Sequence, residues 1–314
     1  MSLVHAVEVP RLLVSRLEAV IGGPRYADLV GTADRVRSVL AGRTIWNVNS
    51  TAAGGGVAEM LQVLVGYVKD LDIPIGWLVI TGDATFFAIT KRLHNQIHGF
   101  LSGAPLGAAE AGYYAQMLAA NAVELAARIR PGDVVLLHDP QTAGLAAPLA
   151  QAGARVVWRC HIGVDREDEV TQAGWEFLRP HLAAAEAYVF SRRDYVPAWL
   201  PAAKVWIIPP SIDPFSPKNQ PLAADIVQAI MVKLGVLDGP APGAPATFVR
   251  RDGDVGTVSR PAVVVGEGRP RPDDPVLVQV SRWDRLKDMA GVMRGFADHV
   301  APGGDGYLML VARR

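Results

Sequence analysis

Short apolar runs rich in β-branched residues alternate with helical stretches between Thr44 and Pro209, and this alternation restricts the fold more than any other feature. Parallel strands need long crossover connections, usually helices, and strands covered on both faces are apolar almost throughout. The sequence therefore predicts a doubly wound α/β domain. Its expected strands are Thr44–Asn49, Ile75–Ile80, Val134–His138, Val156–Cys160, Tyr188–Phe190 and Val205–Ile208.

The intervening stretches carry helical signals. Ala108–Arg130 is rich in alanine and ends at Pro131 and Gly132, which stop helices. Two further helices, Arg11–Ile21 and Tyr26–Leu40, are expected to form a helical extension over residues 1–42. The helix after the first strand places its apolar residues on one face. These residues are Val57, Leu61, Leu64, Val65, Val68 and Leu71.

A domain boundary is expected where prolines interrupt the pattern, from Pro209 to Pro214. Proline supplies no ladder donor, so the chain must leave the sheet there. We therefore assign residues 1–213 to the first domain and 214–275 to a connecting segment. That segment contains a helix, Ala223–Leu234, and a surface loop rich in glycine and proline, Gly239–Pro275.

Residues 276–314 are predicted to form one βαβ unit. Three elements are too few to make an independent sheet domain covered on both faces, so we expect only the start of a second domain. The apolar sheet edge of such a unit should make the segment after Val276 dimerise, aggregate or remain mobile, and a homodimer is among the expected partners. The elements are Val276–Val280, Lys287–Val300 and Tyr307–Val311.

Charge and cysteine content exclude several functions. The chain has 31 basic and 31 acidic residues, so nothing in its net charge favours nucleic-acid binding. The single cysteine, Cys160, cannot form an internal disulfide, and no Cys/His spacing predicts a metal site. The first twenty residues lack the apolar segment of a signal peptide, and no stretch is long enough to span a bilayer. We expect a soluble, cytoplasmic protein without a membrane partner.

Gly54, Gly55 and Gly56 lie between a predicted strand and a predicted helix. Small residues let a ligand approach the backbone, and the helix N-terminus favours an anion or a sugar hydroxyl. A tight βα turn without a ligand explains the glycines equally well. The spacing is neither a Walker loop nor the dinucleotide fingerprint, which disfavours a nucleotide-dependent oxidoreductase.

Polar residues follow the third and fourth expected strands. In open α/β sheets the ligand crevice lies outside the carboxyl ends of the strands, so these residues should face one cleft together with the glycines. Taken singly, each histidine is more typical of a structural residue, and the repeated placement is what favours function. The residues are His138, Asp139, Gln141, Arg159 and His161.

Arg282 and Lys287 flank a strand-to-helix connection in the second domain. A guanidinium fork, an ammonium and a helix N-terminus together suit a diphosphate. Alternatively, both are solvated charges that pair with Asp284 or Asp288.

Several stretches resemble the retaining glycosyltransferases of the GT-B fold, and among these the trehalose synthases, which join a nucleotide-activated glucose to free glucose. The resemblance runs from about Arg43 to Val311. It implies two Rossmann-like domains, of which the first binds the acceptor and the second binds the nucleotide sugar. The matching stretches are Val48–Thr51 with Gly54–Glu59, His138–Gln141 with Arg159–Ile162, Pro209–Pro214, and Gln279–Asp284 with Lys287.

The resemblance also implies roles for individual residues. His161 would contact the transferred glucose, and Arg282 with Lys287 would neutralise the leaving diphosphate as the catalytic residues. Retention is usually explained by front-face attack, with UDP-glucose or ADP-glucose as donor and no cofactor or metal required. The implied substrate-binding residues, for glucose, trehalose or the donor, are Gly54, Gly55, Gly56, Glu59, His138, Asp139, Gln141 and Arg159.

The sequence departs from that family in its second domain, which usually continues with further βα units that carry the base pocket and a two-glutamate motif. We therefore expect a truncated donor domain, and no transferase activity from this chain alone. The alternative is a non-catalytic sugar-binding module or partner subunit derived from such an enzyme.

Overall fold

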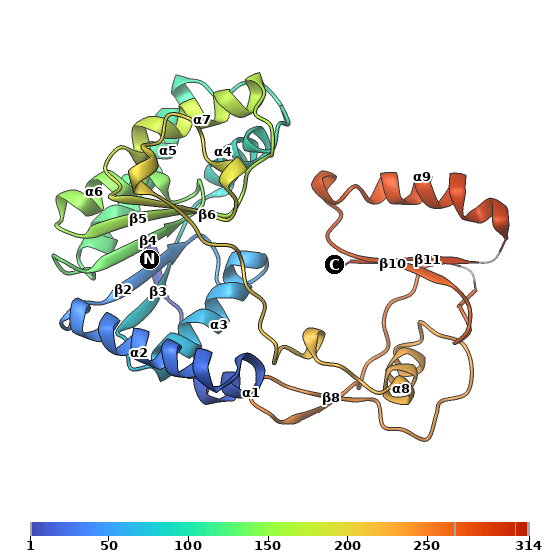
Figure 1. Cartoon of the computed structure of the whole chain (residues 1–314). Helices are drawn as coiled ribbons and strands as arrows, with labels where there is room; N and C mark the ends of the chain where they lie inside the picture. The colour runs from blue at the N-terminus through green and yellow to red at the C-terminus, as the bar shows by residue number, and fades with distance from the viewer. Residues whose placement is uncertain (1, 267, 305, 313–314) are drawn as a thin grey trace. The chain divides into compact units, whose positions relative to one another are not determined.

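In a computed structural model, the chain divides into two compact units, residues 1–212 and 213–314. The structure describes residues 2–266, 268–304 and 306–312. A seven-stranded sheet forms the first unit, with strand order β1-β3-β2-β4-β5-β6-β7 (Figure 1), and confirms the predicted doubly wound α/β class. The strands are β1 (Val4–Ala6), β2 (Ile45–Asn49), β3 (Ile75–Ile80), β4 (Val134–His138), β5 (Arg155–Cys160), β6 (Ala187–Phe190) and β7 (Val205–Ile207).

Strands β2 to β7 run parallel, and β1 pairs with β3 in the antiparallel sense. β2 lies between β3 and β4. From β2 the chain continues to β3 on one side, whereas from β4 it continues to β5 on the other side. The strand order thus reverses between β2 and β4. Such a switch point, at the carboxyl ends of the strands, is where open α/β sheets bind their ligands.

Helices cover both faces of this sheet. Figure 1 shows α4, α5 and α7 over one face and α2 and α3 over the other. No helix in the described parts of the chain is long and apolar enough to cross a membrane. The helices of the first unit are α1 (Glu18–Ile21), α2 (Gly23–Leu40), α3 (Gly56–Asp70), α4 (Ala84–Ile97), α5 (Ala108–Ala126), α6 (Ala146–Gln151) and α7 (Glu169–Leu182).

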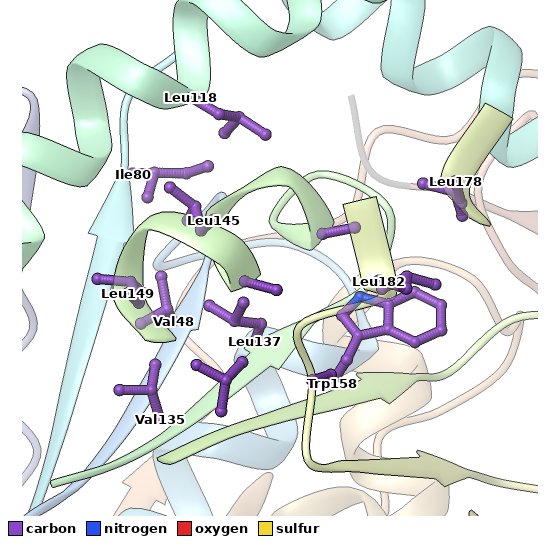
Figure 2. Close-up of a cluster of buried hydrophobic side chains, with 14 of the residues drawn as sticks. Val48, Ile80, Leu118, Val135, Leu137, Leu145, Leu149, Trp158, Leu178 and Leu182 are labelled. Carbon is purple, nitrogen blue, oxygen red and sulfur yellow. The ribbon is translucent and has the colours of Figure 1, made fainter. Parts of the chain in front are cut away.

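The largest core lies between the sheet and helices α4 to α7 (Figure 2). Leu137 of β4 and Trp158 of β5 have no exposed surface there. Trp158 also meets Trp175 of α7 edge to face, with ring centroids 6.4 Å apart. Because side chains alternate along a strand, burying these residues on one face directs their sequence neighbours to the opposite face.

Asp133, immediately before β4, links this strand to β2 by hydrogen bonds. Its carboxylate is 99% buried and accepts hydrogen bonds from the Thr44 amide (2.8 Å), the Arg130 amide (3.0 Å) and the Trp46 indole (3.0 Å). Burial by itself raises its pKa, but the hydrogen bonds outweigh burial and the pKa lies below its ordinary value. The carboxylate is therefore ionised and paired with backbone and indole donors.

The N-terminal segment differs from the helical extension that we predicted. Residues 4–6 form β1, whose neighbouring Leu3 amide donates to the Glu124 carboxylate of α5 at 2.8 Å. The expected helix at Arg11–Ile21 is shorter, since it comprises a 3-10 turn at Val14–Leu17 followed by the single turn α1. A three-residue edge strand is too short for a periodic pattern, so only its tertiary pairing reveals it.

The second unit contains the predicted βαβ unit, with β10 and β11 paired in parallel. The span Gly239–Pro275, expected to be a loop, instead includes the hairpin β8–β9. Its turn requires Gly253, which has φ 97°. The elements of this unit are α8 (Ala224–Leu234), β8 (Thr247–Val249), β9 (Val255–Thr257), β10 (Val276–Val280), α9 (Met289–His299) and β11 (Tyr307–Val311).

Replacing Asp133 with alanine should lower the free energy of unfolding by about 2–4 kcal/mol, because three donors lose a buried acceptor. The matched control is Glu186→Ala, which removes an exposed ion pair with Arg155 and should cost at most ~1 kcal/mol. Urea unfolding of both variants measures the difference. Equal losses would contradict the structural role given to Asp133.

Candidate functional site

Buried polar side chains gather at the carboxyl ends of the central strands. Asn47 and Asn49 of β2 are 1% and 4% exposed, His138 of β4 is 1% exposed and Arg159 of β5 is 8% exposed. Each alternates with an apolar core residue on the same strand, so all four point away from the core that Figure 2 shows. They therefore lie on one face of the sheet, beside the switch point between β2 and β4.

Two predicted histidines contact each other within this group. His161, the residue after β5, places its Nε2 atom 3.0 Å from Nδ1 of His138. On its other side, Nε2 of His138 lies 3.1 Å from Oδ1 of Asn47. Our sequence analysis missed Asn47. The available signal was an asparagine two residues before another asparagine, in a strand that is otherwise apolar.

Asp139 holds the backbone at this edge of the sheet. Its Oδ1 atom accepts the His161 amide at 2.8 Å, its own amide donates to the Arg159 carbonyl at 2.8 Å, and its carbonyl accepts the Trp158 indole N–H at 3.1 Å. Asp139 adopts a left-handed conformation with φ 64°, which aspartate tolerates better than most residues. The ends of β4 and β5 are thereby joined through one side chain.

Burial governs the charges in this cluster. It lowers the pKa of His138 well below 6.5 and that of His161 to about 4, and the charge of Arg159 acts in the same direction on both. Burial raises the pKa of Asp139 to about 7, although the His161 amide and Arg159 favour its carboxylate. At neutral pH the cluster thus contains two uncharged imidazoles beside a guanidinium.

The turn after Asp139 carries Gln141, which is half-buried. Tyr114 of α5 fixes this turn, because its hydroxyl donates to the Pro140 carbonyl at 2.6 Å and accepts the Gly144 amide at 3.1 Å. Thr142 adds a hydrogen bond from its hydroxyl to the His138 carbonyl at 2.8 Å. The sequence analysis did not identify Tyr114, since an aromatic residue on a helix face usually indicates core packing.

The predicted glycine loop follows β2 at the same edge of the sheet. Gly54 and Gly55 have φ 77° and 100°, and a β-carbon at Gly54, Gly55 or Gly56 would meet no atom within 4 Å. Gly54 and Gly55 are thus required by backbone conformation, and the space around all three glycines is open to a ligand. Glu59, in the first turn of α3, is exposed.

Asn49 shapes the start of this loop. Its Oδ1 atom accepts the Trp77 indole N–H at 2.7 Å, and its Nδ2 atom donates to the Thr51 carbonyl at 2.8 Å. The sequence analysis included Asn49 in the matching stretch Val48–Thr51 but gave it no role. Both polar groups of this amide have partners, so its role in the folded chain is to hold the loop.

Arg282 and Lys287 both lie in the connection from β10 to α9, within the second unit, and both are exposed. Arg282 is 3.9 Å from the Asp284 carboxylate. The carboxylate of Asp288 accepts the Gly291 amide at the start of α9 (3.0 Å). The role of Arg282 and Lys287 in neutralising a leaving diphosphate stays a prediction.

Two further observations concern other places in the molecule. A surface depression of about 470 Å³ lies at the opposite edge of the sheet, where β3 begins, and its charged residues Arg11 and Asp72 are exposed and paired at 3.0 Å. Because this charged pair is exposed and already paired, we do not place the candidate site in the depression but at the carboxyl ends of the strands.

Among residues 2–266, 268–304 and 306–312, no three His, Cys, Asp or Glu side chains form a group that could hold a metal ion.

Comparison with known sequences gives a family match. Residues 47–197 match the family described as trehalose synthase, N-terminal domain. The chain is 30% identical over 269 residues to a trehalose synthase of Rubrobacter xylanophilus, covering 85% of this chain and 55% of that protein. It is 38% identical over 184 residues to a trehalose synthase of Thermococcus litoralis, covering 59% and 43%. The chain therefore spans about half the length of these relatives.

Solved structures confirm the predicted GT-B fold. An α,α-trehalose-phosphate synthase (UDP-forming) of Burkholderia xenovorans, in complex with glucose-6-phosphate, matches with a TM-score of 0.54 and 15% identity, covering 87% of this chain and 66% of that one. An E. coli trehalose-6-phosphate structure bound with UDP-2-fluoro glucose matches with a TM-score of 0.55 and 14% identity, covering 86% and 65%. At these identities the likeness concerns the fold alone.

Gly55→Ala should destabilise the protein by about 1–3 kcal/mol, because alanine is strained at φ 100°. Gly56→Ala is the matched control, since Gly56 begins α3 with an ordinary backbone conformation and should be neutral or stabilising by up to ~1 kcal/mol. Thermal unfolding compares the two. Equal effects would show that the loop conformation does not require glycine.

Lowering the pH from about 7 to 5 should destabilise the native protein more than the His161→Gln variant. In the unfolded chain the imidazole binds a proton below its ordinary pKa of 6.5, whereas in the folded chain His161 binds one only below about 4. Between these values the unfolded state binds more protons and is favoured. Urea unfolding of both proteins across this pH range tests the difference, and parallel pH profiles would count against a neutral, partly buried His161.

Proposed function

We propose that the chain contributes to a glycosyltransferase that forms trehalose, because residues 47–197 match the family described as trehalose synthase, N-terminal domain. In this proposal the first unit binds the acceptor sugar, and the βαβ unit of residues 276–312 belongs to the part that binds the nucleotide sugar. The observation that carries the proposal is the polar cluster of His138, Asp139, Arg159 and His161 at the switch point of the sheet.

The chemistry of that cluster suits a sugar. Sugar hydroxyls both donate and accept hydrogen bonds, and an uncharged imidazole also offers one donor and one acceptor. A carboxyl group with a pKa of about 7, such as that of Asp139, exists in both protonation states near neutrality. The open glycine loop after β2 lets a ligand approach the backbone at the same edge.

We propose that the reaction transfers glucose from UDP-glucose or ADP-glucose to free glucose with retention of configuration. Negative charge develops on the leaving diphosphate as the glycosidic bond breaks, so cations aimed at it accelerate the reaction. Arg282 and Lys287 are assigned this role, and His161 is assigned the contact with the transferred glucose. Front-face attack needs no carboxylate nucleophile, unlike the retaining hydrolases. We assign no nucleophilic role to Asp139, because its Oδ1 atom already accepts the His161 amide.

Calorimetry with glucose and with trehalose tests the first part of the proposal on the full chain. His161→Ala should weaken sugar binding about tenfold, because a buried polar contact is lost. His5→Ala is the matched control, since His5 is an exposed residue of the edge strand β1 and should leave binding unchanged. A folded chain that binds neither sugar would contradict an acceptor site at this position.

Turnover is a separate measurement. The chain is incubated with glucose and either UDP-glucose or ADP-glucose, and the product is identified by NMR, which distinguishes the retained α-linkage from an inverted one. Trehalose formation would support the enzyme proposal directly. Sugar binding without turnover is the expected result for this chain alone. It would favour the alternative, a non-catalytic sugar-binding module or partner subunit, only if turnover stayed absent when the rest of the donor domain of a related enzyme was supplied.

A further inference from the structure

His138 and His161 share one hydrogen bond, and this limits where their protons lie. Nδ1 of His138 and Nε2 of His161 are 3.0 Å apart, with the ring planes at only 13° to each other. Each uncharged imidazole carries a single proton, on one of its two nitrogens. One ring must therefore donate across this contact while the other accepts with a bare nitrogen, so the two tautomers are linked.

Two charged or titratable groups adjoin the pair, and both bear on its charge state. Arg159, on the neighbouring strand β5, disfavours a second positive charge on either ring. Asp139 contacts His161 through its backbone amide rather than through the ring. Burial and Arg159 thus keep both rings neutral, which is the condition for a single shared proton.

Asn47 decides which ring donates. Its Oδ1 atom, an acceptor, lies 3.1 Å from Nε2 of His138. Nε2 of His138 must then carry the proton, which leaves Nδ1 of His138 bare and able only to accept. Nε2 of His161 consequently carries the proton of the second ring. Asn47 is fixed in β2, and its side chain is 1% exposed, so its carbonyl oxygen is held in place.

We propose that Asn47 and His138 are positioning residues that fix the tautomer of His161, leaving its Nδ1 atom as an unprotonated hydrogen-bond acceptor. Neither residue needs to touch a ligand to do this. The consequence for recognition rests on the proposed function: Nδ1 of His161 would accept a hydrogen bond from a hydroxyl group of the bound sugar. The hydrogen-bond chain also crosses the switch point, since Asn47 is on β2 and His138 is on β4.

A purely structural role for Asn47 makes a different prediction. If Asn47 only filled space and satisfied one buried donor, its loss would reduce stability without changing His161, from which it is separated by the ring of His138. The tautomer of His161 is therefore the observable that separates positioning from packing.

The experiment uses the full chain with ¹⁵N-labelled histidine and no sugar present, so its outcome is independent of the proposed function. Long-range ¹H–¹⁵N correlation spectra distinguish the two tautomers of each ring, and His161→Gln and His138→Gln assign the signals. In the native chain we expect both rings in the Nε2–H form. In Asn47→Leu, His161 should lose this single form and populate the Nδ1–H form, because His138 no longer has an acceptor for its Nε2 proton.

Asn49→Leu is the matched control. Asn49 is also a buried asparagine on the same face of β2, but it bonds to Trp77 and Thr51 rather than to a histidine. Both histidine tautomers should stay unchanged in this variant. An unchanged His161 tautomer in Asn47→Leu would overturn the proposal, as would the same change in both variants.

The native chain supplies a second measurement in case Asn47→Leu does not fold. The large one-bond ¹H–¹⁵N coupling of the shared proton shows which nitrogen carries it, and a scalar coupling between Nε2 of His161 and Nδ1 of His138 shows that the two rings share the bond. A proton on Nε2 of His161 supports the proposal, and a proton on Nδ1 of His138 overturns it.

Where sugar binding is established, Asn47→Leu should also weaken it roughly three- to tenfold.

Discussion

The packing of one sheet face against helices α4 to α7 is the constraint on which the candidate site depends. Leu137 and Trp158 are buried in that core, and strand alternation then leaves only one direction for His138 and Arg159. The functional side chains are therefore positioned by their apolar neighbours. A site built this way needs no long loop to carry it, since the strands themselves set its geometry.

Burial has a second effect, on charge. A solvated histidine is partly protonated near neutrality, whereas His138 and His161 remain uncharged because the sheet and its helices remove them from water. At neutral pH Arg159 is the fully charged side chain of the cluster. Asp139, whose pKa is about 7, is only partly ionised. The cluster thus offers uncharged hydrogen-bonding groups beside the positive charge of Arg159.

The sequence allowed the sheet, its parallel direction and the strand ends to be predicted, because apolar runs and helix stop signals are local patterns. The positions of His138 and His161 at strand ends followed from the general rule for open sheets. Asn47 could not be found in this way. Two asparagines in an otherwise apolar strand are a weak local signal, and the importance of Asn47 depends on the register that sets β2 beside β4. The strands β1, β8 and β9 have three residues each, too few for a period to be recognised.

Asp139 illustrates how tightly this edge of the sheet is coupled. One residue provides a left-handed turn after β4, an acceptor for the His161 amide and backbone bonds to Arg159 and Trp158. An exchange of Asp139 that removed its side-chain acceptor, such as Asp139→Ala, would also release the amide of His161 at the end of β5. The residues of the site consequently cannot all be exchanged independently of one another. Positions outside this junction, such as Gln141 or the glycine loop, can be exchanged without breaking these hydrogen bonds.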